Sequence, residues 1–130
     1  MSRPDEGGEA LLVLTTTSDD ESARRLARVL VEEGLAACVT RSAVRSTYRW
    51  DGSEPGAVPK PVSARAICED DEVLLVIKTA RHRLATLERR LLELHPYSCP
   101  ELVVVAPEHV ESRYLAWLLD ACSGDAAPER

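Results

Sequence analysis

Phenylalanine is absent from this sequence, and two tryptophans and three tyrosines are its only aromatic residues. No apolar run approaches the roughly 20 residues that a membrane-spanning helix needs, so we expect no membrane segment. Basic residues are also few, because 16 Lys and Arg stand against 22 Asp and Glu and leave a formal net charge of -6. Nucleic acids and anionic membranes are bound through clustered Lys and Arg. The composition therefore argues against both as partners.

The sequence also has no CxxC motif, and its four cysteines are scattered along the chain. Their spacing is not that of a zinc site, and we expect reduced thiols. The polar start, residues 1–9, lacks the apolar core of a signal peptide, which predicts a disordered lead-in and a cytoplasmic protein. The length and the 45% hydrophobic content suit one domain. We place that domain at residues 10–122, with a flexible tail over 123–130.

The first half of the domain alternates between apolar runs and one amphipathic pattern. Leu11–Leu14 is a short apolar run that predicts a buried strand, with a turn following it. Ser18 stands three residues before Glu21, which predicts a capping box at the start of a helix. Gly34 is expected to stop this helix. A long strand should then run over 35–50, with a break near 41–43.

The second half repeats the pattern after a loop. Residues 53–66 have the proline and glycine content of a loop, so we take them as an insertion at a hairpin tip. A leucine stripe from Leu84 to Leu94 predicts a helix that His95 and Pro96 end. The strands expected around this helix cover 67–79 and 102–106, and a short last helix carries Tyr114 and Trp117.

This order of elements predicts an α+β fold, the ferredoxin-like sandwich, in which β-α-β-β-α-β is followed by a C-terminal helix. Residues 73–77 and 102–106 are apolar at consecutive positions, so both faces of these strands must be covered. Two helices cover only one face, and the last helix is too short to cover the other. We therefore expect self-association through the second sheet face.

The turn from His95 to Glu101 places an imidazole, a phenol and a carboxylate between two prolines. His95 could serve as a metal ligand or proton carrier, or only as a hydrogen-bonded helix end. Cys99 is a candidate ligand close to His95, whereas Cys38 is either a soft copper ligand or an inert core thiol. Glu101 could hold Lys78 or His95 in a polar cluster, or form a rim salt bridge.

Other polar and aromatic residues have two interpretations each. Lys78 follows five apolar residues, so its stem should be buried and its ammonium should need a partner. The acidic segment 69–72 could attract divalent ions loosely, but we interpret it as a solvated strand end. The aromatic residues are expected to anchor an interface, with ligand stacking as the alternative. They are Tyr48, Trp50, Tyr97, Tyr114 and Trp117.

Five linked motifs resemble the CutA divalent-cation-tolerance family over Leu11 to Leu119. They are Leu35–Val39, Tyr48–Gly52, Val76–Thr79, His95–Tyr97 with Pro100–Glu101, and Tyr114–Leu118. The resemblance implies a ferredoxin-like fold assembled as a tight trimer, similar to the PII signal-transduction proteins, and binding of copper or other divalent metals. Two features depart from the family: the segment 53–66 replaces a short turn, and the first loop lacks the cysteine that some members place there.

The resulting expectation is a homotrimer, not an enzyme, that takes part in copper or other divalent-cation tolerance. We expect it to bind Cu(II) or a small ligand in clefts between subunits. The expected metal ligands are His95, Cys38 and Cys99, and the expected ligand-binding residues are Trp50, Lys78, Tyr97, Glu101 and Tyr114. The alternative is a PII-like regulatory module that binds an anionic metabolite, although no glycine-rich phosphate loop is present. Acid-base catalysis by His95 and Glu101 ranks last.

Overall fold

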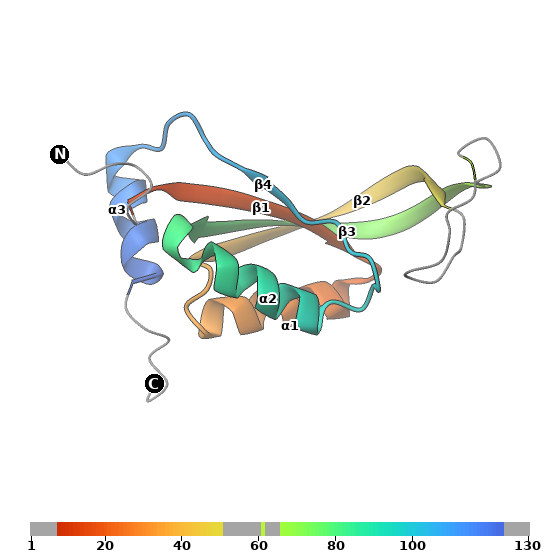
Figure 1. Cartoon of the computed structure of the whole chain (residues 1–130), viewed down its shortest axis with the longest axis horizontal. Helices are drawn as coiled ribbons and strands as arrows, with labels where there is room; N and C mark the ends of the chain where they lie inside the picture. The colour runs from red at the N-terminus through yellow and green to blue at the C-terminus, as the bar shows by residue number, and fades with distance from the viewer. Residues whose placement is uncertain (1–7, 51–60, 62–65, 124–130) are drawn as a thin grey trace.

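A computed structural model of the chain describes residues 8–50, 61 and 66–123 and has the predicted α+β architecture (Figure 1). The elements are β1 (Ala10–Thr17), α1 (Asp20–Glu32), β2 (Cys38–Trp50), β3 (Ala66–Ala80), the 3-10 turn η2 (Arg81–Arg83), α2 (Leu84–Leu94), β4 (Val103–Val105) and α3 (Ser112–Ala121). The β-α-β-β-α-β order with one extra helix is confirmed. The expected insertion at 53–66 lies outside the described residues except for Pro61 and Ala66.

The four strands form one sheet in the order β2-β3-β1-β4, and every pairing is antiparallel. β1 pairs with β3 only from Val73 to Ala80, whereas β2 follows β3 all the way to the pair Trp50 and Ala66. The outer parts of β2 and β3, residues 44–50 and 66–72, therefore project beyond the rest of the sheet (Figure 1). We call this two-stranded extension the arm.

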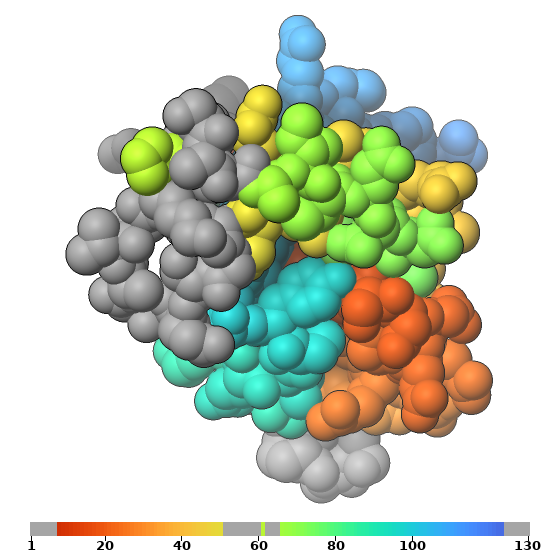
Figure 2. All heavy atoms as spheres, turned by 90° about the vertical axis from the view of Figure 1, so that its right-hand side faces the viewer, coloured from red at the N-terminus to blue at the C-terminus, as the bar shows by residue number. Residues whose placement is uncertain are grey.

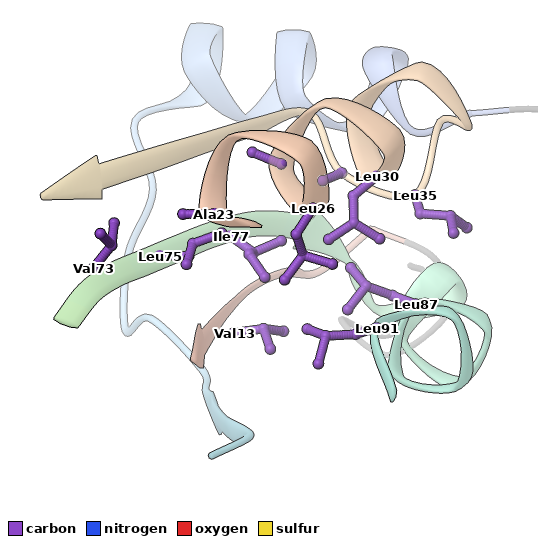
Figure 3. Close-up of a cluster of buried hydrophobic side chains, with 12 residues drawn as sticks. Val13, Ala23, Leu26, Leu30, Leu35, Val73, Leu75, Ile77, Leu87 and Leu91 are labelled. Atoms are coloured by element: carbon purple, nitrogen blue, oxygen red, sulfur yellow. The ribbon is translucent and has the colours of Figure 1, made fainter. Parts of the chain in front are cut away.

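The core lies between one sheet face and the two helices α1 and α2 (Figure 3). Alternate residues of β3 point into it, because successive side chains of a strand face opposite sides. α1 adds the apolar stripe that its 3.6-residue period predicts. A fully buried leucine contributes about 1.5–3 kcal/mol, so this face supplies most of the fold's stability. Its largest members are Val13, Leu26, Leu30, Leu75, Ile77, Leu87 and Leu91.

The start of α1 differs from the predicted capping box. Asp19, not Ser18, is the N-cap: its backbone is extended and its Oδ1 accepts the Ser22 amide at 2.8 Å. The reason is that β1 continues to Thr17, which moves the first helical residue to Asp20. The predicted stop is confirmed, since α1 ends before Gly34, whose φ of 72° suits a residue without a side chain.

Three strand predictions need correction. β1 does not turn at Thr15, because Thr15 and Thr17 are buried and pair with β3. β2 has no break at 41–43, since each of its residues has a partner in β3, but it starts at Cys38 and not at residue 35. β4 is only three residues long. Glu9, in the lead-in predicted over 1–9, accepts a hydrogen bond from Arg81 Nε at 2.7 Å.

The second sheet face is less covered than the first. Leu12 and Leu14 of β1 and Val76 of β3 are half-buried on it, and Val103 and Val105 of β4 are 47% and 40% exposed. α3 lies at the end of the sheet farthest from the arm (Figure 1). Within the described residues, no helix is long and apolar enough to cross a membrane.

Candidate functional site

A pocket of about 430 Å³ lies at the base of the arm. Three parts of the chain meet there: the end of β1, the arm, and the connection between α2 and β4. Figure 2 shows the cyan connection against the green β3 at this end of the molecule. The described lining residues are Thr16, Ser46, Tyr48, Trp50, Glu72, Tyr97, Ser98, Cys99 and Glu101. We call this cavity the arm pocket.

The pairing of β2 with β3 decides which arm residues face the pocket. Ser46 lies opposite Asp70, and Tyr48 lies opposite Cys68. Paired residues of antiparallel strands share a face, and alternate residues of one strand share it as well. Glu72 therefore lies on the same face as Asp70, the residue to which the Tyr48 hydroxyl donates. This register brings acidic and aromatic side chains together.

His95 fixes the connection that forms the opposite wall. Its ring is 7% exposed, its Nε2 lies 2.8 Å from the Thr16 carbonyl oxygen and 3.2 Å from the Thr15 hydroxyl, and its Nδ1 accepts the Tyr97 amide at 3.1 Å. A carbonyl oxygen can only accept and an amide N–H can only donate, so the ring is neutral with its proton on Nε2. Burial lowers the pKa of His95 and favours this neutral form.

Two phenols donate to two carboxylates of β3. Tyr97 donates to Glu72 Oε2 at 2.6 Å, and Tyr48 donates to Asp70. Burial, followed by the bond to Glu72, raises the pKa of Tyr97, and the bond to Asp70 raises the pKa of Tyr48 to about 12. Both phenols therefore keep their protons at neutral pH, and the two carboxylates act as acceptors.

The described lining of the arm pocket carries negative charge. Glu72 and Glu101 are the only charged residues of its described lining, which includes no Lys, Arg or His. Within the part of the chain that the structure describes, neither carboxylate takes part in an ion pair. Carboxylates without a counter-charge attract cations and repel anions. The geometry therefore favours a cationic ligand.

A family model described as CutA1 divalent ion tolerance protein matches residues 11–121. The chain belongs to the CutA1 divalent ion tolerance family. It is 39% identical over 108 residues to the divalent-cation tolerance protein CutA of Thermus thermophilus, covering 82% of this chain and 92% of that protein. The Pyrococcus horikoshii protein of the same name is 33% identical over 110 residues, covering 85% and 95%.

Solved structures agree with this assignment. The CutA structure from Synechococcus elongatus superimposes with a TM-score of 0.77 at 34% identity and covers 89% of this chain and 92% of that chain. The divalent cation tolerance protein of Thermus thermophilus gives a TM-score of 0.74 at 36% identity, with 88% and 99% covered. The ferredoxin-like fold expected from the sequence is confirmed.

Four of the eight site residues predicted from the sequence line the arm pocket of this CutA-family chain. Trp50, Tyr97, Cys99 and Glu101 line it together. His95 lies behind it as the residue that fixes the connection to β1. The stiff turn between the two prolines thus predicts one wall of the pocket.

Lys78, Cys38 and Tyr114 lie elsewhere. Lys78 donates to the Thr40 hydroxyl and lies 3.8 Å from Cys38 Sγ. Six residues separate it from Glu72 along β3, or about 20 Å of strand. Lys78 therefore lies away from Glu101 within one chain, and the described hydrogen bonds of His95 go to Thr15, Thr16 and Tyr97. Tyr114 stacks with Trp117 of α3 at a centroid distance of 5.4 Å, and burial raises its pKa.

Five of the described lining residues are not among the predicted site residues, and Glu72 and Tyr48 are the two of them with hydrogen bonds to the site's acidic and phenolic groups. Sequence patterns place Glu72 at a solvated strand end, and Tyr48 in an interface with ligand stacking as the alternative. The signal that links the two residues is the register of β2 and β3, which pairs the acidic segment 69–72 with residues 44–47, directly before Tyr48. In a hairpin with a tight turn, the register of the two strands follows from counting residues outward from the turn. Here a long proline-containing loop joins the strands, so the sequence does not show the register.

The residues predicted as metal ligands do not meet within one chain. Cys38 is beside Lys78, and Cys99 lines the arm pocket. His95 would have to give up a hydrogen bond in order to bind a metal, because both ring nitrogens are engaged. Among the described residues, no group of three or more His, Cys, Asp or Glu side chains could hold a metal ion. The ligand assignment therefore stays a prediction.

Proposed function

We propose that this CutA-family chain acts in divalent-cation tolerance by binding a cation in the arm pocket. The observation that carries the proposal is the pair of carboxylates, Glu72 and Glu101, that line the cavity without any basic neighbour in its described lining. Cys99 adds a thiol, which is a soft ligand suited to copper. The names of the Thermus and Pyrococcus relatives support a role in cation tolerance, and neither name refers to a catalytic activity.

The charge of the pocket disfavours the alternative of a PII-like module that senses an anionic metabolite. A phosphate or carboxylate ligand needs Lys, Arg or a helix N-terminus. The arm pocket offers two carboxylates instead. An anion entering it would meet repulsion from Glu72 and Glu101 with no opposing charge in the described lining.

The working form that we propose is a homotrimer in the cytoplasm, joined through the second sheet face. Val103 and Val105 are exposed there, and Leu12 and Leu14 are half-buried beside them. Each 100 Å² of apolar surface removed from water contributes about 2.5 kcal/mol. A second chain seated on this face would complete the coordination that one chain does not supply, so the metal site would lie at a subunit boundary.

Calorimetric titration of Cu(II) into the full chain tests this function. Glu101→Gln removes one pocket charge and Cys99→Ser removes the soft ligand, whereas Glu88→Gln removes an exposed charge on α2 and serves as the matched control. We expect the first two variants to bind Cu(II) at least about fivefold more weakly than the wild type, as loss of one charged contact implies. The control should bind as the wild type does.

His95 provides a second comparison in the same titration. We expect His95→Gln to weaken Cu(II) binding less than Cys99→Ser does, because His95 shapes the pocket and its ring nitrogens are already hydrogen-bonded. Equal Cu(II) affinity in the wild type, Cys99→Ser and Glu101→Gln would rule out the arm pocket as the metal site.

A further inference from the structure

The aromatic side of the arm pocket is not explained by a bare metal ion. Tyr48, Trp50 and Tyr97 make up a third of the nine described lining residues. Aromatic rings are poor ligands for a hydrated divalent ion, whose partners are oxygen, nitrogen and sulfur atoms. Aromatic faces beside carboxylates instead suit organic cations, which have an apolar body and a positive charge.

We propose that the arm pocket binds an aliphatic di- or polyamine. This inference rests on the proposed function, in that it takes the arm pocket to be the site where the chain binds its cation. It adds the chemical class of that cation: a flexible hydrocarbon chain that carries two or more ammonium groups.

The rings are exposed and electron-rich. Within the single chain Tyr48 is 40% and Trp50 is 43% exposed, so part of each ring surface is not covered by the chain itself. The Tyr48 and Tyr97 hydroxyls each donate to a carboxylate, and such a bond shifts electron density toward the phenol oxygen and ring. An ammonium or its adjoining methylene groups gain from contact with such a face.

The two carboxylates of the pocket also suit a ligand that carries two ammonium groups. Glu72 belongs to β3, and Glu101 belongs to the connection before β4, so the two carboxylates come from separate walls. No group of three ligating side chains that could hold a metal lies among the described residues. An ammonium needs only one carboxylate, and a diamine can place one ammonium group at each of the two.

The size of the cavity agrees with an organic ligand. Its volume of about 430 Å³ lies within the range of small-molecule sites, roughly 300–1,000 Å³. Ser46 and Ser98 add hydroxyl acceptors to the lining, which ammonium N–H groups can use. The combination of aromatic faces, separated carboxylates and small hydroxyls is that of an amine site.

Fluorescence of Trp50 gives a direct test. Trp117→Phe in the full chain leaves Trp50 as the only tryptophan, and spermidine is titrated into it in metal-free buffer that contains a chelator. We expect a saturable change in Trp50 emission. MgCl₂ at the same cation charge should not reproduce it, because Mg²⁺ supplies charge without an apolar body.

Variants in the same background assign the site. Glu101→Gln and Glu72→Gln should each weaken spermidine binding roughly fivefold, whereas Glu88→Gln on α2 should leave it unchanged. Trp50→Leu, followed by calorimetry, should weaken it about as much. Far-ultraviolet circular dichroism of each variant confirms that the fold is retained.

The outcomes separate this inference from the proposed function. If Glu101→Gln weakens Cu(II) but the wild type shows no saturable response to millimolar spermidine, the amine inference fails and the proposed function stands. If spermidine binds equally well to Glu88→Gln and wild type but poorly to Glu101→Gln, the inference holds, whatever copper does. A response that MgCl₂ reproduces, or that the pocket variants retain, overturns the inference.

Discussion

Replacing His95 should reveal how strongly one side chain holds the wall of the arm pocket. His95→Leu leaves three polar groups without their partner: the Thr15 hydroxyl, the Thr16 carbonyl oxygen and the Tyr97 amide. An unsatisfied buried group costs about 1–3 kcal/mol, and water can reach part of this site. We expect the free energy of unfolding to fall by about 2–4 kcal/mol. His95→Gln keeps one donor near Thr16 and should cost about half as much.

The same residue makes the stability depend on pH with a defined sign. Burial lowers the pKa of His95, so below its ordinary value of about 6.5 the unfolded chain binds a proton that the folded chain refuses. The contribution of His95 is therefore complete above about pH 6.5 and decreases as the pH falls toward the folded pKa. The limiting slope for one group is about 1.4 kcal/mol per pH unit.

Urea unfolding from pH 7.5 to pH 5, at one fixed protein concentration, measures both effects. The difference in unfolding free energy between the wild type and His95→Gln should shrink as the pH falls, because only the wild type loses the His95 contribution. Keeping the concentration fixed matters because self-association shifts apparent stability. A difference that stays constant over this range, or a His95→Leu variant as stable as the wild type, would refute the account of His95.

Three further predictions concern other parts of the chain. Tyr97→Phe, which removes the phenol that donates to Glu72, should lower stability by about 1 kcal/mol in urea unfolding. The N-cap substitution Asp19→Ala should lower the stability in urea unfolding and Ser18→Ala should leave it almost unchanged; the reverse order would contradict the cap. For the proposed trimer, Val103→Lys should lower the mass found by sedimentation equilibrium, whereas Val31→Lys on α1 should leave it unchanged.

Local sequence patterns predict the helices and strands of this fold, but not the residues at which each one begins and ends. The apolar runs and stripes identify the four strands and three α-helices of the described residues, because burial on one face imposes a period that the sequence records. The capping-box pattern places the start of α1 one residue early, at Ser18, because the length of β1 depends on its pairing with β3. The break expected in β2 is absent for the same reason. Strand pairing is long-range information that no local motif contains.

The candidate site divides in the same way. Cys99 and Glu101 can be found from the sequence because they belong to one stiff, continuous turn. Glu72 cannot, because its place beside that turn depends on the arm, whose register the loop before β3 conceals. Lys78 is expected near Glu101. It lies instead in β3, six positions beyond Glu72 and away from the arm pocket. Sequence patterns correctly group site residues that are close in the chain. They do not group residues that are distant in the chain and come together only through strand pairing.

The most direct test of the central claim is a calorimetric titration of Cu(II) into the wild type and the double variant Glu72→Gln, Glu101→Gln. This pair of changes removes both charges from the described lining and keeps an acceptor for the Tyr97 hydroxyl. We predict that the double variant binds Cu(II) at least about tenfold more weakly, as loss of two charged contacts implies. Unchanged Cu(II) affinity in a folded double variant would contradict cation binding in the arm pocket.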